Sequence, residues 1–332
     1  MRATVRDVAS WAGVSPKTVS NVLNGTVNVR PATRARVEQA MLALDYVPNL
    51  AARGLRNGRT GLIAIALSDL QVPFFAEMLH HFVNAAAARG LQVQVEETGW
   101  DPGREARLLS RAREHQVDGL ILNPVNRETT AVQPGIALPP VVLIGEVHLP
   151  IVDRVWMDNA AAIADLTGEL IKTGHRRIAL LGTSDHPAAV DRLEGYRRAL
   201  RSAGLPLDPR LEIASEDWRS VSAARALNAF LDSDPAPVDA VVCCTDGAAM
   251  GALLALHDHG LRVPEDVSVT GYDNINESAV TVPPLTTIDF DKALVVDTAV
   301  ELLMDRIAAP GGPPRQITLP HHLVWRASTI PR

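Results

Sequence analysis

The segment at residues 4–24, TVRDVASWAGVSPKTVSNVLN, predicts two short helices joined by a tight turn. Apolar residues in its first half recur every three or four positions, which places them on one helix face. These residues are Val5, Val8, Ala9 and Ala12. Gly13 follows them and can adopt the backbone angles that a sharp turn between helices requires. This layout is typical of a helix-turn-helix, whose second helix reads the major groove of DNA.

The second helix is predicted to begin at Pro16 with Ser15 as its N-cap, since a serine hydroxyl accepts from the first turn and proline needs no donor there. On its outer face, Asn21 suits a bidentate contact to adenine, and Lys17 suits guanine or a phosphate. The alternative is a small helical subdomain whose polar face only meets water. The residues expected to face DNA are Thr4, Arg6, Ser15, Pro16, Lys17, Thr18, Ser20, Asn21 and Asn24.

A third amphipathic helix is predicted over residues 31–44, and Pro48 prevents its continuation. Four motifs follow one another along the chain in the order found in the LacI/GalR family of transcriptional regulators. They are TVRDVASWAGVSPKTVSNVLNG, TRARVEQAMLALDYVPN, AARGL and NGRTGLIAIAL. The chain resembles this family over its whole length, which implies operator DNA as a partner.

The resemblance also implies a function for the linker at residues 48–60. In the family, two copies of this segment fold in the minor groove, and a leucine matching Leu55 inserts between base pairs and kinks the duplex. Arg53 is then available for a nearby phosphate. Gly54 disfavours a helix by up to about 1 kcal/mol relative to Ala, so we expect the linker to be disordered without DNA. We also expect weaker coupling between the effector cleft and DNA binding than in relatives. The alternative is a linker that only connects the domains and inserts no side chain between base pairs.

The charge of the chain is divided unevenly. Residues 1–60 contain nine Lys/Arg and three Asp/Glu, a net charge of +6, whereas the remaining residues contain 23 Lys/Arg and 35 Asp/Glu, a net charge of −12. Such asymmetry is typical of a basic nucleic-acid-binding head on an acidic body. Contact with phosphates is therefore expected to be confined to the head.

Cysteine content and hydropathy argue against export or membrane insertion. Cys243 and Cys244 are the only cysteines and are adjacent in a predicted buried strand, so they cannot build a disulfide framework. No apolar run approaches the roughly 20 residues that span a bilayer, and the N-terminus lacks the apolar core of a secretory peptide. A reducing cytoplasm is the expected location.

From residue 61 onward, short β-rich runs alternate with helical runs, which predicts parallel sheets covered by helices. Strands are expected at 62–67, 91–97, 119–124 and 140–145, then at 177–182, 239–244 and 266–273. Helices are expected at 74–89, 102–115, 159–173, 188–203, 220–232 and 246–259. The segment 285–288 and a helix at 290–307 resemble the crossover by which family members return to their first lobe.

The predicted fold class is therefore α/β with three parts: an N-terminal three-helix helix-turn-helix head (1–47), a hinge linker (48–60), and two doubly wound parallel-sheet lobes of the periplasmic-binding-protein type (61–332). The third part is expected to bind an effector and to dimerise.

Ligands of open parallel sheets bind beyond the carboxyl ends of the strands. Phe74 and Phe75 follow the first strand, and the family uses this pair to contact ligand. The pattern R-x-x-G-Y places Arg192 where the family has an effector-binding arginine, whose rigid guanidinium suits vicinal hydroxyls or a carboxylate. Core aromatics and a surface arginine are the alternatives. His186, on the loop before Arg192, is expected to be solvated.

In the second lobe, Trp218 lies where the family often has an aromatic residue that stacks on the effector. Asp273, in GYDN, ends a predicted buried strand and is expected to direct an acceptor into the cleft. Core packing and the capping of a turn are the respective alternatives. Phe290 lies where some relatives have a polar effector contact, so it is expected to form an apolar wall. Thr245 replaces the usual asparagine, which argues against a direct effector contact.

Catalysis and transport are the rival classes. The sequence has no phosphate-binding glycine loop, no G-x-S-x-G and no metal-spaced His/Cys set, and His175 is expected to close a helix end. We therefore expect no enzyme activity, metal or cofactor. A sugar-binding transport protein is disfavoured by the helix-turn-helix. The expected protein is a homodimeric regulator, a repressor, that reads an approximate palindrome and responds to a small polar effector such as a sugar; a phosphoprotein partner remains an alternative.

Overall fold

The computed structural model describes residues 3–24, 29–46, 59–114, 116–126, 128–233 and 236–329. The chain forms two compact units, Met1–Thr60 and Gly61–Arg332. Within the described ranges, no helix is long and apolar enough to cross a membrane.

The described part of the first unit consists of three helices: α1 (Val5–Ala12), α2 (Pro16–Asn24) and α3 (Pro31–Ala43). α1 begins with a capping box, in which the Thr4 hydroxyl accepts from the Asp7 amide and the Asp7 carboxylate accepts from the Thr4 amide. Gly13 ends α1 with φ 62°, and Ser15 Oγ accepts from the Thr18 amide at 3.1 Å, which confirms the predicted turn and cap. The apolar faces form one small core: Val8, Ala9, Ala12, Val19, Val22, Val37 and Ala40.

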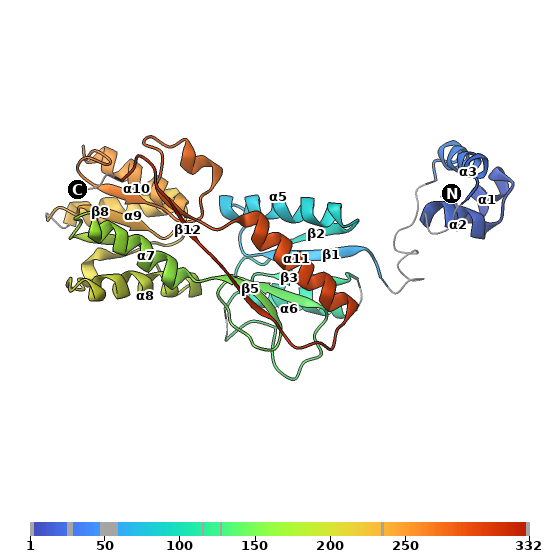
Figure 1. Ribbon diagram of the computed structural model, residues 1–332, viewed down its shortest axis with the longest axis horizontal. Helices are drawn as coiled ribbons and strands as arrows, with labels where there is room; N and C mark the ends of the chain where they lie inside the picture. The colour runs from blue at the N-terminus through green and yellow to red at the C-terminus, as the bar shows by residue number, and fades with distance from the viewer. Residues whose placement is uncertain are drawn as a thin grey trace. The chain divides into compact units, whose positions relative to one another are not determined.

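The first lobe of the second unit contains a six-stranded parallel sheet with the order β11-β5-β4-β3-β1-β2. Its strands are β1 (Leu62–Leu67), β2 (Gln92–Glu97), β3 (Gly119–Leu122), β4 (Val141–Ile144), β5 (Asp153–Met157) and β11 (Gln316–Leu319). Its helices are α5 (Pro73–Ala88), α6 (Pro102–Arg113) and α11 (Lys292–Ala308). Alternate residues of β1 enter two different cores, Ile63 with α5 and α11, and Ala64 with α6, because helices cover both faces (Figure 1).

The second lobe contains a four-stranded parallel sheet with the order β7-β6-β8-β9. Its strands are β6 (Ile178–Thr183), β7 (Glu212–Ala214), β8 (Ala240–Cys243) and β9 (Ser268–Thr270). Its helices are α7 (Asn159–Lys172), α8 (Pro187–Ser202), α9 (Ser220–Ser233) and α10 (Asp246–Asp258), with 3₁₀ turns η1 (Pro209–Leu211) and η2 (Asn276–Ala279). α7 packs beside α8, and α9 packs beside α10.

Both lobes are completed by distant parts of the chain. Helix α11 packs on α5 and on β3, β4 and β5, so the predicted return to the first lobe is confirmed. After β11 the chain returns to the second lobe, where β12 (His322–Val324) pairs antiparallel with β10 (Thr287–Asp289). The Val269 amide then donates to the Ser328 carbonyl at 2.9 Å, which joins the C-terminal segment to β9. The connections between the lobes place the carboxyl ends of both sheets beside one cleft.

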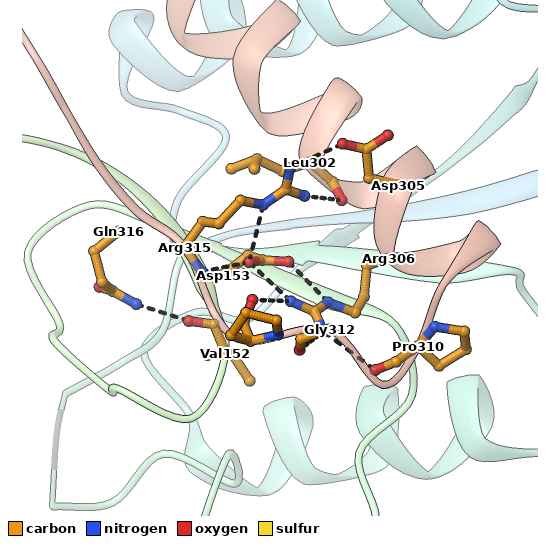
Figure 2. Close-up of polar contacts among 10 residues, drawn as sticks. Val152, Asp153, Leu302, Asp305, Arg306, Pro310, Gly312, Arg315 and Gln316 are labelled. Carbon is orange, nitrogen blue, oxygen red and sulfur yellow. Dashed lines mark hydrogen bonds and ion pairs between the residues drawn. The ribbon is translucent and has the colours of Figure 1, made fainter.

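A buried carboxylate holds the last strand of the first lobe in place (Figure 2). Asp153, at the start of β5, is fully buried and accepts from Arg306 of α11 through Nε at 2.9 Å and Nη2 at 3.0 Å. It also accepts from the Arg315 amide at 2.7 Å, directly before β11. Arg306 donates in addition to the carbonyls of Gly312 and Pro313. These contacts, called the Asp153 clasp below, join β5, α11 and the loop before β11.

Each strand predicted from the pattern is present, with ends that differ by a few residues. Five further strands are not predicted by the pattern: β5, β7, β10, β11 and β12. All five have three to five residues, too few to show a period of their own, and pairing with distant strands determines them.

Candidate functional site

Five of the residues that the sequence predicts to face DNA are described with their side chains on α2: Pro16, Lys17, Thr18, Ser20 and Asn21. Lys17 is exposed and Asn21 is half-buried, and neither side chain makes a hydrogen bond or an ion pair within the described part of the head. Thr4 and Ser15 instead serve as helix caps. Pro16 and Arg6 are exposed, Thr18 and Ser20 are half-buried, and the side chain of Asn24 lies outside the described residues, as do all of Arg53 and Leu55. The helix thus has free polar groups toward solvent.

A pocket in the second unit lies at the carboxyl ends of strands from both lobes, as the topology of open parallel sheets requires. The first lobe and α11 contribute Val72, Phe74, Phe75, Met78, Asn123, Ile144, Gly145, Glu146, Val155, Met157 and Val295. The second lobe contributes His186, Ala188, Arg192, Trp218, Thr245 and Asp273. Five of the six predicted effector residues therefore lie around one cavity: Phe74, Phe75, Arg192, Trp218 and Asp273.

Arg192 is held in one position by the second lobe. Its guanidinium is buried, donates from Nε to Asn159 Oδ1 at 2.8 Å, and donates from Nη1 to the Cys244 carbonyl. The guanidinium carbon also lies 3.6 Å from the ring centroid of Tyr272 and 4.9 Å from that of Trp218. Cation–π contact and two hydrogen bonds leave the side chain little freedom. The positive charge is therefore preorganised at the pocket wall.

Asp273 presents a buried acceptor to the same pocket. Its side chain is 5% exposed, and its carboxylate has no hydrogen bond from any described residue. Burial raises the pKa of this carboxyl well above its usual range, although the charge of Arg192 opposes the shift. The carboxylate oxygens are not fully buried, so a ligand in the pocket can reach them and donate a hydrogen bond.

Thr245 behaves differently, as its sequence position predicts. Its hydroxyl accepts from the Ala248 amide at 3.0 Å as the N-cap of α10 and donates to the Trp218 carbonyl at 3.2 Å. Both functions of the hydroxyl are therefore already used within the protein. Thr245 contributes to the wall of the pocket and positions Trp218.

The placement of Phe290 differs from the prediction. Phe290 is 1% exposed and does not line the pocket; its ring packs at 5.0 Å on that of Tyr272. Tyr272 in turn lies against Arg192. The physical reason is that β10 ends one residue earlier and directs the phenyl ring into the core between the lobes. Phe290 thus supports the pocket from behind.

Two polar lining residues, Asn123 and Glu146, are not named by the sequence analysis, and a third, His186, has a different environment from the one expected. Asn123 accepts from Ser68 Oγ and donates to the Ile144 carbonyl at 3.0 Å, while Glu146 accepts from Asn159 Nδ2 at 2.7 Å. Asn123 follows the end of β3 and Glu146 follows the end of β4. Because ligands of parallel sheets bind beyond the carboxyl ends of the strands, the sequence positions of both residues could have indicated them. His186 was expected to be solvated and instead lies in the pocket wall.

His186 is enclosed because it caps α8 between aromatic rings. Its Nδ1 accepts from the Ala188 amide at 3.3 Å, and its ring lies edge-to-face with Trp218 at 4.9 Å. Burial lowers the pKa of His186 to about 4, an effect that Glu146 opposes and Arg192 reinforces. The imidazole is therefore neutral at pH 7 and forms part of an aromatic wall together with Phe74 and Phe75, whose rings are 5.4 Å apart.

A helix-turn-helix head and a two-lobed domain with a ligand-sized cleft define a class of protein, the DNA-binding regulator that senses a small molecule. Comparison with known proteins agrees. Residues 4–49 match the family described as bacterial regulatory proteins, lacI family, and residues 167–329 match the periplasmic binding protein-like domain.

Relatives cover the whole chain. The HTH-type transcriptional repressor PurR of Aliivibrio fischeri (strain MJ11) is 35% identical over 336 residues, 99% of each chain. The HTH-type transcriptional regulator CelR of Thermobifida fusca is 37% identical over 337 residues, 98% of each chain. The chain belongs to the LacI family of bacterial transcriptional regulators.

Solved structures show the same fold. The lac repressor dimer bound to operator and the anti-inducer ONPF matches with a TM-score of 0.85 and 28% identity, over 99% of this chain and 100% of that one. A CelR-cellobiose complex matches with a TM-score of 0.72 and 34% identity, over 98% of this chain and 100% of that one.

Proposed function

We propose that this protein is a repressor that binds operator DNA through its helix-turn-helix and releases or tightens that binding when a small polar effector, a sugar, enters the pocket. The observation that carries the proposal is the presence of two charged groups, the fixed guanidinium of Arg192 and the carboxyl group of Asp273, in one pocket walled by aromatic side chains. Sugars present hydroxyl donors and acceptors on their edges and C–H groups on their faces, which match these two kinds of surface. The named relative CelR, solved with cellobiose, supports this ligand class.

The proposed mechanism is linkage between the cleft and the DNA-binding heads. An effector that prefers one arrangement of the lobes shifts a homodimer toward or away from the geometry that lets both heads bind. Twofold symmetry in the protein then requires an approximate palindrome in the operator. Because operator DNA is the partner, the cytoplasm is the proposed place of action.

A screen tests the effector. Thermal shift against a panel of monosaccharides and disaccharides should raise the melting temperature for at least one sugar, and gel shift on DNA flanking the protein's own gene should respond to that sugar. A sugar that binds without altering operator affinity would instead favour the alternative function, a sugar-binding transport protein.

The DNA-reading residues have a matched pair of variants. Asn21→Ala should cost roughly 1–3 kcal/mol on operator and relax the preference at one base position, whereas Arg6→Ala should weaken binding evenly across sequences. Equal losses for Asn21→Ala on operator and on random DNA would remove Asn21 from base reading.

The domain division remains part of the proposal: a head at 1–47, a hinge at 48–60 and an effector-binding, dimerising part at 61–332. In the hinge, Leu55→Ala should lower operator affinity and DNA bending, while Gly54→Ala should raise affinity because it favours the helix. An unbent operator in circular-permutation gel shifts of the native protein would contradict the wedge.

A further inference from the structure

The loop after β2 contains an unusual turn at the edge of the cleft. Gly99 and Trp100 both have positive φ, 58° and 59°, and the Asp101 amide donates to the Thr98 carbonyl at 3.0 Å. Two consecutive left-handed residues form a tight turn of the type I′ kind, in which the second position is normally glycine. A tryptophan there is disfavoured by its own backbone, so contacts elsewhere in the fold must stabilise it.

Those contacts come from the opposite lobe. The ring of Trp100, in the first lobe, meets the ring of His186 edge-to-face at 4.4 Å with an interplanar angle of 80°. His186 in turn meets Trp218, whose Nε1 donates to the Gly182 carbonyl at 2.9 Å. Both partners in the second lobe are thus fixed by their own hydrogen bonds and line the pocket, while Trp100 lies outside the lining set.

Polar contacts accompany this aromatic row between the lobes. Asp69, after β1, pairs with Arg219, before α9, at 2.6 Å. On α5, Glu77 accepts from the Asn276 amide at 2.7 Å. In this arrangement the pocket offers a cavity of about 60 Å³.

We propose that Trp100 is a specificity-determining residue that closes the mouth of the pocket by docking on His186. The docked ring limits the effector to one that fits behind it, and longer ligands, which would extend through the mouth, prevent the docking. This inference rests on the proposed function only for the identity of the ligand. The contact between Trp100 and His186 involves residues of this chain alone.

The first test therefore measures the distance between the lobes without added sugar. Spin labels on Ala106→Cys of α6 and Val190→Cys of α8, both exposed, report the distance between the lobes by double electron–electron resonance. Trp100→Asn keeps a residue that tolerates the left-handed turn but removes the ring. We expect a longer and broader distance distribution than in the parent. Trp325→Asn, which removes a similarly exposed tryptophan that does not line the effector pocket, should leave the distribution unchanged.

A second pair of variants assigns the effect to the ring contact. His186→Asn retains a residue that caps helices well, and the double variant with Trp100→Asn should open the lobes no further than either single variant. Distance distributions of Trp100→Asn that coincide with the parent overturn the proposal, and so do additive effects of the two substitutions.

The third test uses cellobiose and cellotetraose as probes in calorimetry. Trp100→Asn should weaken cellobiose about tenfold and reduce the preference for cellobiose over cellotetraose, because the mouth no longer closes. An unchanged preference overturns the role in specificity. If neither sugar binds the parent protein, the cello-oligosaccharides are excluded as effectors while the distance measurements still decide whether Trp100 closes the cleft.

Discussion

Two buried aspartates of this protein have opposite environments. Asp153, in the first lobe, accepts hydrogen bonds from Arg306 and from the Arg315 amide, and it has no exposed surface (Figure 2). Asp273, in the second lobe, is 5% exposed and has no hydrogen bond to its carboxylate within the described part of the chain. The first carboxylate is satisfied by the fold, and the second is left for a ligand. Satisfaction of buried polar groups thus separates structural from functional residues here.

The largest expected effect comes from breaking the Asp153 clasp. Asp153→Asn removes the fully buried charge that faces Arg306 and leaves that guanidinium, whose side chain is 13% exposed, with weaker partners. We expect a loss of about 3–5 kcal/mol in the free energy of unfolding, measured by urea denaturation, because an uncompensated buried charge is costly. A loss below about 1 kcal/mol would show that the clasp is not a stability determinant.

The matched substitution Asp273→Asn should lower effector affinity and leave the free energy of unfolding nearly unchanged. Since burial raises the pKa of Asp273, the ionised form is disfavoured in the folded protein, and a neutral isostere should leave stability near pH 7 unchanged or increased. Affinity for the sugar found by screening should fall by about 0.5–1.5 kcal/mol, the value of a hydrogen bond between uncharged groups. Calorimetry that shows normal effector binding would remove Asp273 from the site.

An intermediate effect on the free energy of unfolding is expected when the pH is lowered, because His186 is buried in its neutral form. Burial lowers its pKa to about 4, so the unfolded chain takes up a proton near pH 6.5 while the folded protein does not. The stability it contributes is complete above pH 6.5 and is lost as the pH falls toward 4. Between pH 7 and pH 5 we expect a loss of about 1–2 kcal/mol beyond that of His186→Asn, measured by urea denaturation at both pH values. Parallel pH profiles of the two proteins would contradict this.

The smallest effect is expected from an ion pair that is exposed. Arg262 contacts Asp266 at 2.8 Å, but the arginine side chain is 69% exposed. Asp266→Asn should leave the free energy of unfolding, measured by urea denaturation, unchanged within error, because solvent screens such pairs. A change as large as that of Asp153→Asn would mean that burial is not what distinguishes the two sites.

Much of the fold follows from local patterns. The helix-turn-helix is predicted because a glycine turn, a serine cap and an apolar stripe are all encoded within 21 adjacent residues, 4–24. The longer strands of both lobes are predicted by apolar runs between helical segments. Strands β10, β11 and β12 are not, because partners far away in the chain determine them.

The pocket was predicted in part. The resemblance to a family and the strand-end rule together indicate Arg192, Trp218 and Asp273, which do converge on one cavity. Phe290 was misplaced because sequence position does not specify which way a residue at a strand end points. Trp100 is not indicated by any local pattern, and His186 is expected to be solvated, because the contact that encloses both joins segments 86 positions apart.

The sequence by itself determined the class of the protein, since capping, turn chemistry, periodicity and the division of charge are properties of neighbouring residues. Tertiary structure alone decided which buried charges are satisfied and which rings meet across the cleft. The physical reason is that burial and hydrogen bonding depend on contacts between segments that are far apart in the chain. Asp153 begins β5 and Asp273 lies three residues beyond the end of β9; both are aspartates, and the surrounding fold makes one a structural clasp and leaves the other in the pocket wall.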